Sequence, residues 1–96
     1  MAQRQRAEYL AECFWPGVQE SDLHSLDQRA ISTAAELSID GDAVRYLGSL
    51  LMREDEVVLC RFEGSEEAVR RVVEGAAIPF ERILEAATSP WKSESA

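Results

Sequence analysis

The sequence predicts an α+β sandwich of ferredoxin-like topology, a four-stranded antiparallel sheet with two helices on one face. The prediction rests on two stretches with apolar residues at helical spacing, four short stretches rich in apolar and aromatic residues, and their order. That order is strand, helix, strand, strand, helix, strand. Two right-handed βαβ units joined by a hairpin give the strand order 4-1-3-2. A chain of 96 residues has room for one modest core.

The first strand and helix follow from local composition. Glu8–Trp15 is aromatic and apolar and stops at Pro16-Gly17, which is typical of a strand followed by a turn. The next stretch predicts a helix with Ser21 as its N-cap and Asp40-Gly41 as its stop. Its apolar stripe consists of Leu23, Leu26, Ala30, Ala34 and Leu37.

The second half, like the first, consists of a strand, a helix and a strand, and a hairpin joins the two halves. Val44–Gly64 predicts a hairpin whose acidic turn is Arg53–Glu56, and Ser65 is the expected N-cap of a second helix. Glu66 and Glu67 lie where the helix dipole favours acids. Phe80–Thr88 gives the last strand. The buried stripe of the second helix consists of Ala68, Val69, Val72, Val73 and Ala76.

Composition sets the boundaries of the domain and excludes several classes of partner. We expect a flexible N-terminus over residues 1–6, the domain over 7–88, and a loose C-terminal tail over 89–96. Ten basic and eighteen acidic residues give a net charge of -8, which argues against nucleic acid and against anionic membrane surfaces. No apolar run approaches ~18 residues, and the start lacks the core of a signal peptide. We therefore expect a cytoplasmic protein.

Two cysteines, Cys13 and Cys60, lie in apolar strand-like runs, and we expect both to be buried free thiols. With one histidine, they do not suffice for an iron–sulfur centre or a four-ligand structural zinc site within one chain.

Strand alternation predicts which side chains lie on the sheet face that the helices leave open. Glu12 and Arg61 fall on this face, on the two central strands, and Tyr46 and Gly48 join them in the second strand. Leu47, Ser49 and Leu51 would then lie beneath the helices. The last strand offers Glu81, Ile83 and Glu85, or Arg82 with Leu84, and the second set fits a core less well. The open face carries many apolar residues, so a second subunit or a ligand is expected to cover it.

Glu12, Tyr46, Gly48 and Arg61 are the candidate ligand-binding residues. Glu12 has the chemistry of a metal ligand or general base, and Arg61 that of a group that orients an anion. The competing interpretation is a plain cross-strand ion pair at an interface. Tyr46 is a ligand donor or a rim residue. His24 and Glu12 are the candidate metal ligands, although His24 also fits a solvated helix position.

Three short motifs resemble a bacterial family of short ferredoxin-like proteins of unknown function. They are the arginine-tyrosine-leucine-x-serine strand at Arg45–Ser49, the acidic turn at Arg53–Glu56, and the proline-phenylalanine-glutamate-arginine ending at Ile78–Arg82. The resemblance extends over Glu8–Ala86 and implies the same fold.

The wider group includes a nickel-binding protein that forms a dimer. The resemblance therefore implies a homodimer and a divalent metal such as nickel. Some members carry a histidine in the second strand where this chain has Gly48, which leaves His24 as the one imidazole here. The usual proline of the hairpin turn is replaced by Arg53.

These observations leave three functional hypotheses from different classes: a binding protein, an enzyme, and a purely structural or regulatory dimer. The first is a small dimeric binding protein that holds a small ligand or metal ion at the open sheet face. The alternative is a cofactor-independent enzyme of isomerase, cyclase or monooxygenase type, with its pocket between sheet and partner, which rests on fold analogy. A closed pocket containing Glu12, Tyr46 and Arg61 would favour the enzyme.

Overall fold

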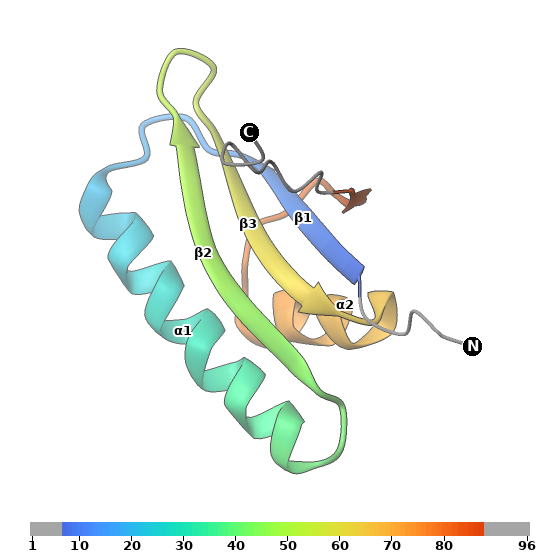
Figure 1. The fold of residues 1–96 in the computed structure, drawn as a ribbon. Helices are drawn as coiled ribbons and strands as arrows, with labels where there is room; N and C mark the ends of the chain where they lie inside the picture. Colours follow the sequence, from blue (N-terminus) through green and yellow to red (C-terminus); the bar gives the residue numbers. More distant parts are fainter. Residues whose placement is uncertain (1–6, 88–96) are drawn as a thin grey trace, which may run out of the picture.

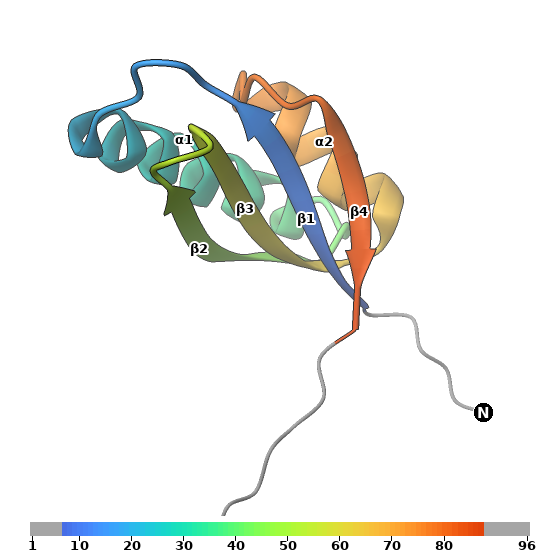
Figure 2. The same cartoon turned by 90° about the horizontal axis from the view of Figure 1, so that it is seen from above.

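The computed structural model describes residues 7–87 and confirms the predicted topology. The strands form one antiparallel sheet in the order β2-β3-β1-β4, and both helices cover the same face of it (Figures 1 and 2). The elements are β1 (Ala7–Phe14), α1 (Glu20–Ile39), β2 (Val44–Met52), β3 (Val57–Gly64), α2 (Glu66–Gly75) and β4 (Arg82–Ala86).

The core lies between the two helices and the sheet face that they cover. The predicted stripe of α2 is buried throughout, and α1 contributes Leu26, Ala30 and Ala34. On the sheet, Phe62 and Cys60 of β3 and Cys13 of β1 are fully buried. Both cysteines are free thiols, as predicted. The local apolar periodicity of both helices was therefore a correct guide to what they bury.

Helix α1 begins earlier than predicted. Its N-cap is Gln19, whose backbone N–H donates to Asp22 Oδ2 at 2.8 Å, so the carboxylate closes the first turn. Ser21 lies inside that turn, and its assignment as the N-cap was wrong. The C-cap is Asp40, as expected from Asp40-Gly41.

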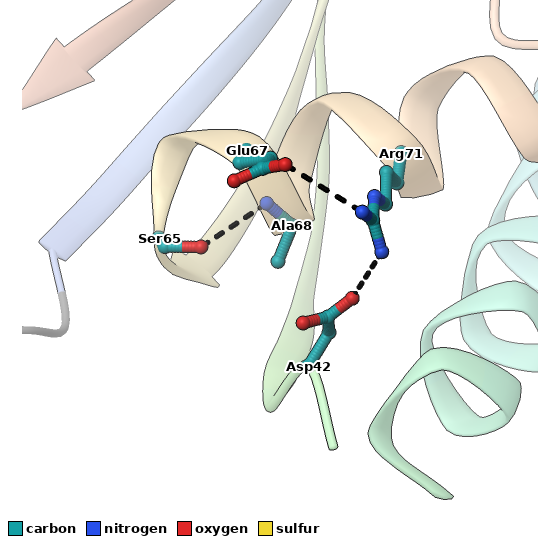
Figure 3. A network of polar contacts seen from close by, with 5 residues as sticks. All are labelled: Asp42, Ser65, Glu67, Ala68 and Arg71. Atoms are coloured by element: carbon teal, nitrogen blue, oxygen red, sulfur yellow. Dashed lines mark hydrogen bonds and ion pairs between the residues drawn. The ribbon is translucent and has the colours of Figure 1, made fainter. Parts of the chain in front are cut away.

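Helix α2 is anchored at its start and along its outer face (Figure 3). The Ser65 Oγ accepts a hydrogen bond from the Ala68 N–H at 3.1 Å, which confirms Ser65 as the N-cap. Arg71 pairs with Glu67 in its own helix at 3.5 Å and also with Asp42 in the α1–β2 connection. This arginine thereby links α2 to the segment that enters β2.

Strand β2 contains a bulge that shifts its alternation. The pairing with β3 skips a residue between Tyr46 and Gly48, and Gly48 has φ +115°, in the region that favours glycine. Tyr46 therefore lies opposite Phe62 on the helix side, and the prediction that it faces the open side was wrong. Beyond the bulge, Ser49 and Leu51 lie on the helix side as predicted. The extra residue is Leu47, which the alternation pattern had placed beneath the helices.

The ends of the chain differ slightly from the expected bounds. Strand β4 is shorter than the predicted Phe80–Thr88, and its pairing places Arg82 and Leu84 on the open face. The expected termini, 1–6 and 89–96, lie outside the described residues, as does Thr88. None of the helices found between residues 7 and 87 has the length and apolar character needed to cross a membrane.

Candidate functional site

The candidate site is the open face of the sheet, the face opposite the one that α1 and α2 cover (Figure 2). Strand register arranges its side chains in rows that run across the strands. At the hairpin end, the rows bring five apolar side chains together, and we call them the apolar patch. Its three most exposed members are Phe14 at 55%, Leu50 at 54% and Met52 at 44%. The apolar patch consists of Phe14, Leu50, Met52, Val57 and Leu59.

The remainder of this face carries charged side chains in pairs of opposite sign, together with Leu10 and Leu84. The Arg61 Nε lies 3.2 Å from Glu8 Oε2, and the Arg82 Nε lies 2.6 Å from Glu12 Oε1. A third pair joins Arg45 Nε and Glu63 Oε1 at 3.7 Å. Three arginines and three glutamates make the open face neutral within a chain of net charge -8.

Glu12 and Arg61 both lie on the open face, as predicted, but they are not partners. In the β1–β3 register, Glu12 lies opposite Leu59 and Arg61 lies opposite Leu10, so the two charges are diagonal neighbours. Each instead pairs with another residue, Arg82 and Glu8 respectively. Glu12 and Arg61, two of the four predicted ligand-binding residues, therefore lie at the border between the apolar patch and the charged pairs.

Gly48 lies directly opposite Arg61 on the same face. A Cβ built at Gly48 would meet no other atom within 4 Å, so the surface is open above it. Leu50 follows in the next row toward the hairpin. Gly48 thus leaves open space above the sheet, between Arg61 and the apolar patch.

The two candidate metal ligands do not come together in one chain. Glu12 points from the open face, whereas His24 is exposed on α1, in the layer that covers the opposite face. Among residues 7–87, no group of three or more histidine, cysteine, aspartate or glutamate side chains is placed to hold a metal ion. Within one described chain, Glu12 and His24 therefore do not form a common metal site.

Tyr46, Ser49 and Asp27 form a polar cluster beneath α1 that the sequence did not predict. The Tyr46 hydroxyl donates to Asp27 Oδ1 at 2.5 Å, and the Ser49 hydroxyl donates to the same oxygen at 3.0 Å. Burial, together with the hydrogen bond to Asp27, holds the pKa of Tyr46 well above its usual range. The cluster joins α1 to β2, and the only signal in the sequence was an aspartate beside the apolar stripe of a helix.

The two buried thiols lie next to each other on β1 and β3. Cys13 is opposite Val58, and Cys60 is opposite Ala11, so the cysteines are diagonal neighbours on the helix side. The hydrogen bond to Cys13, followed by burial, holds the pKa of the Cys60 thiol far above its usual range. Cys60 therefore stays protonated at neutral pH and is a poor nucleophile.

Two surface grooves lie in the helix layer, and neither contains Glu12 or Arg61. One of about 340 Å³ runs between α1 and α2 beside Arg29, and one of about 210 Å³ lies between α1 and β2 beside Tyr46. Tyr46 and the pair Glu12 and Arg61 are on opposite faces of the sheet. The described chain therefore does not bring together the three residues whose common pocket would favour the enzyme hypothesis.

The comparisons with known proteins bear on the fold. The chain is similar to the protein SCO4226 from Streptomyces coelicolor A3(2), known from a crystal structure analysis, at 23% sequence identity and a TM-score of 0.71. The similarity covers 88% of this chain and 100% of that one. No family model matches the chain, and no curated protein matches it. At this level of identity, the similarity supports the ferredoxin-like fold alone.

Proposed function

We propose that this protein is a homodimeric binding protein whose open sheet faces meet and hold a small, largely apolar ligand between them. The observation that carries the proposal is the apolar patch, which lies exposed on the uncovered face of the sheet. A cluster of exposed large apolar side chains is typical of an interaction site. The family resemblance also favours a dimer. The proposal does not include the metal that the resemblance implies, because Glu12 is on the open face of the sheet and His24 is in the helix layer.

The apolar patch supplies a driving force for association. Fully burying a large apolar side chain contributes roughly 1.5–3 kcal/mol. Phe14 and Leu50 are about half exposed, so covering the remainder contributes about 1 kcal/mol for each of them. Because a two-fold dimer uses the same surface twice, each such gain is doubled.

Charge favours a second copy of this chain as the partner. Two molecules of net charge -8 repel each other, but the open face is neutral and its ion pairs are already formed within each chain. Two open faces therefore meet without a direct like-charge penalty. The partner also need not supply new counter-charges.

The open space above Gly48 is where a ligand would lie between the two faces. Leu50 and Leu59 lie in the next row of the sheet, and Arg61 lies opposite the glycine. Pockets for small molecules are commonly apolar with a few placed polar groups. Arg61 and Glu12 would orient a polar group of the ligand at the border of the apolar patch.

Sedimentation velocity and dye binding test the two halves of the proposal. The wild-type protein should sediment as a dimer at micromolar concentration, and Leu50→Glu should be monomeric because it places a charge in the apolar patch. Ile39→Glu is the matched control, since Ile39 is 84% exposed on α1 in the opposite layer and should leave the dimer intact. A monomeric wild type would overturn the dimer.

The apolar dye 1-anilinonaphthalene-8-sulfonate serves as the ligand probe. The dimer should bind it saturably with fixed stoichiometry, and Leu50→Glu should lose that binding while keeping a cooperative melting transition. A wild-type dimer with no saturable dye binding would refute the ligand half and leave a dimer with a closed interface.

A further inference from the structure

The groove between α1 and α2 lies on the opposite layer from the open face and is independent of the proposed function. It has a volume of about 340 Å³, within the range of roughly 300–1,000 Å³ that small-ligand pockets occupy. Gly75 ends α2 against Thr33, and a Cβ there would lie 3.1 Å from Thr33 Cγ2, so glycine allows the close approach. The groove is lined by Gln28, Arg29, Ser32, Thr33, Gly75 and Ala76.

Arg29 differs from the other arginines of the described chain. Every other arginine between residues 7 and 87 forms an ion pair with a carboxylate. Half-buried Arg29 forms none there, and its Nε donates to the Ala76 carbonyl oxygen at 2.8 Å. That bond fixes the guanidinium across the groove from α1 to the end of α2. The two Nη groups, with four N–H donors, remain without a carboxylate partner in this part of the structure.

The hydrogen bond that caps α2 uses only the Nε–H of the Arg29 guanidinium. Three other carbonyls at this end already accept hydrogen bonds from backbone groups, Val72 from the Ala76 N–H, Val73 from the Ile78 N–H and Glu74 from the Ala77 N–H. The Ala76 carbonyl accepts from Arg29 Nε. The two Nη groups are therefore available for a carboxylate or phosphate, which guanidinium binds through two parallel hydrogen bonds.

The neighbouring side chains on α1 have matching chemistry. Gln28 and Ser32 are one helical turn apart, as are Arg29 and Thr33, so all four line the same groove. They supply an amide N–H₂, a guanidinium and two hydroxyls, and no carboxylate is among the described residues that line the groove. Although the chain has eighteen acidic residues, the described lining of this groove carries one positive charge and no negative charge.

We propose that the α1–α2 groove binds a small molecule through an anionic oxygen group, a phosphate or a carboxylate, held by Arg29. Gln28, Ser32 and Thr33 contribute further hydrogen bonds, and the backbone of Gly75 and Ala76 forms the opposite wall. The volume of the groove, about 340 Å³, suits a metabolite-sized anion.

Chemical-shift titration of the full chain tests the site. Inorganic phosphate and acetate are titrated separately at neutral pH, with sodium chloride holding the ionic strength constant. At least one anion should produce saturable shifts confined to the amides of residues 28–33 and 75–77, and the anion that does so identifies the group. Shifts that do not saturate, or that spread over the surface, would overturn the proposal.

Variants separate binding from capping. Arg29→Gln keeps a donor for the Ala76 carbonyl but removes the charged fork, so it should weaken binding about tenfold or more. Arg70→Gln is the control, because Arg70 is an exposed α2 arginine paired with Glu66. Ser32→Ala, at an exposed position, should weaken binding severalfold with an unchanged melting temperature, which keeps the test valid if the Arg29 variant unfolds. A lowered melting temperature with unchanged binding in Arg29→Gln would show that Arg29 only caps α2.

Discussion

Removal of the Tyr46 hydroxyl tests the placement of β2 directly. In the structure this hydroxyl donates to Asp27 across the interface between sheet and helix, and the ring packs on Phe62 with centroids 5.1 Å apart. Tyr46→Phe keeps the ring contact and removes the hydrogen bond. A hydrogen bond to a charged group contributes about 1.5–3 kcal/mol, and this half-buried one belongs at the low end, about 1.5 kcal/mol. Asp27 keeps its bond from Ser49, so no buried carboxylate is left without a donor.

Thermal unfolding followed by circular dichroism measures the effect. A loss of about 1.5 kcal/mol in a domain of this size corresponds to a fall in Tm of about 6–12 °C. A double-mutant cycle with Asp27→Ala should show coupling of about 1 kcal/mol between the two positions, and Ser49→Ala serves as the milder comparison. Sedimentation of Tyr46→Phe should match that of the wild type. An unchanged Tm together with weakened self-association would refute the reasoning, because it would place Tyr46 on the open face.

Further predictions concern the bulge, the α2 cap and alkaline pH. Gly48→Ala should lower the free energy of unfolding by about 1–2 kcal/mol, because alanine is strained at the positive φ of this position. A steric clash does not contribute, since the space for the methyl group is open. An unchanged midpoint of chemical denaturation would contradict this prediction. Ser65→Ala should cost about 1 kcal/mol by removing the bond from the Ala68 N–H, with Ser65→Asp retaining stability. Stability should fall as pH rises above about 10, because Tyr46 has a raised pKa in the folded state and stays protonated there while the unfolded chain ionises. Tyr46→Phe should show a flatter pH profile, and an equal slope in both proteins would exclude this cause.

The pH prediction follows from the sign of the Tyr46 shift. A group whose pKa is raised by folding contributes stability that is complete below its unfolded pKa and is lost as pH rises toward the folded value. For a tyrosine the loss begins near pH 10, and it steepens the decline by at most about 1.4 kcal/mol per pH unit. The two thiols add no net slope of known sign, because their hydrogen bond lowers the pKa of Cys13 and raises that of Cys60.

The sequence by itself determined the topology and most of the core. Helical spacing identified the buried stripes of α1 and α2, and strand alternation placed Glu12 and Arg61 on the open face. These features are local, since each depends only on the 3.6- or two-residue period of a single element. The handedness of βαβ units then leaves few ways to assemble the elements.

Only the tertiary structure determined which side chains contact each other across strands and helices. One extra residue in β2 moved Tyr46 to the opposite face and into contact with Asp27, and no local pattern records that bulge. Register between strands likewise paired Glu12 with Arg82 instead of Arg61, because each ion pair depends on positions far apart in the chain. The groove at Arg29 exists for the same reason, since the end of α2 meets α1 only after the sheet has set the distance between the two helices.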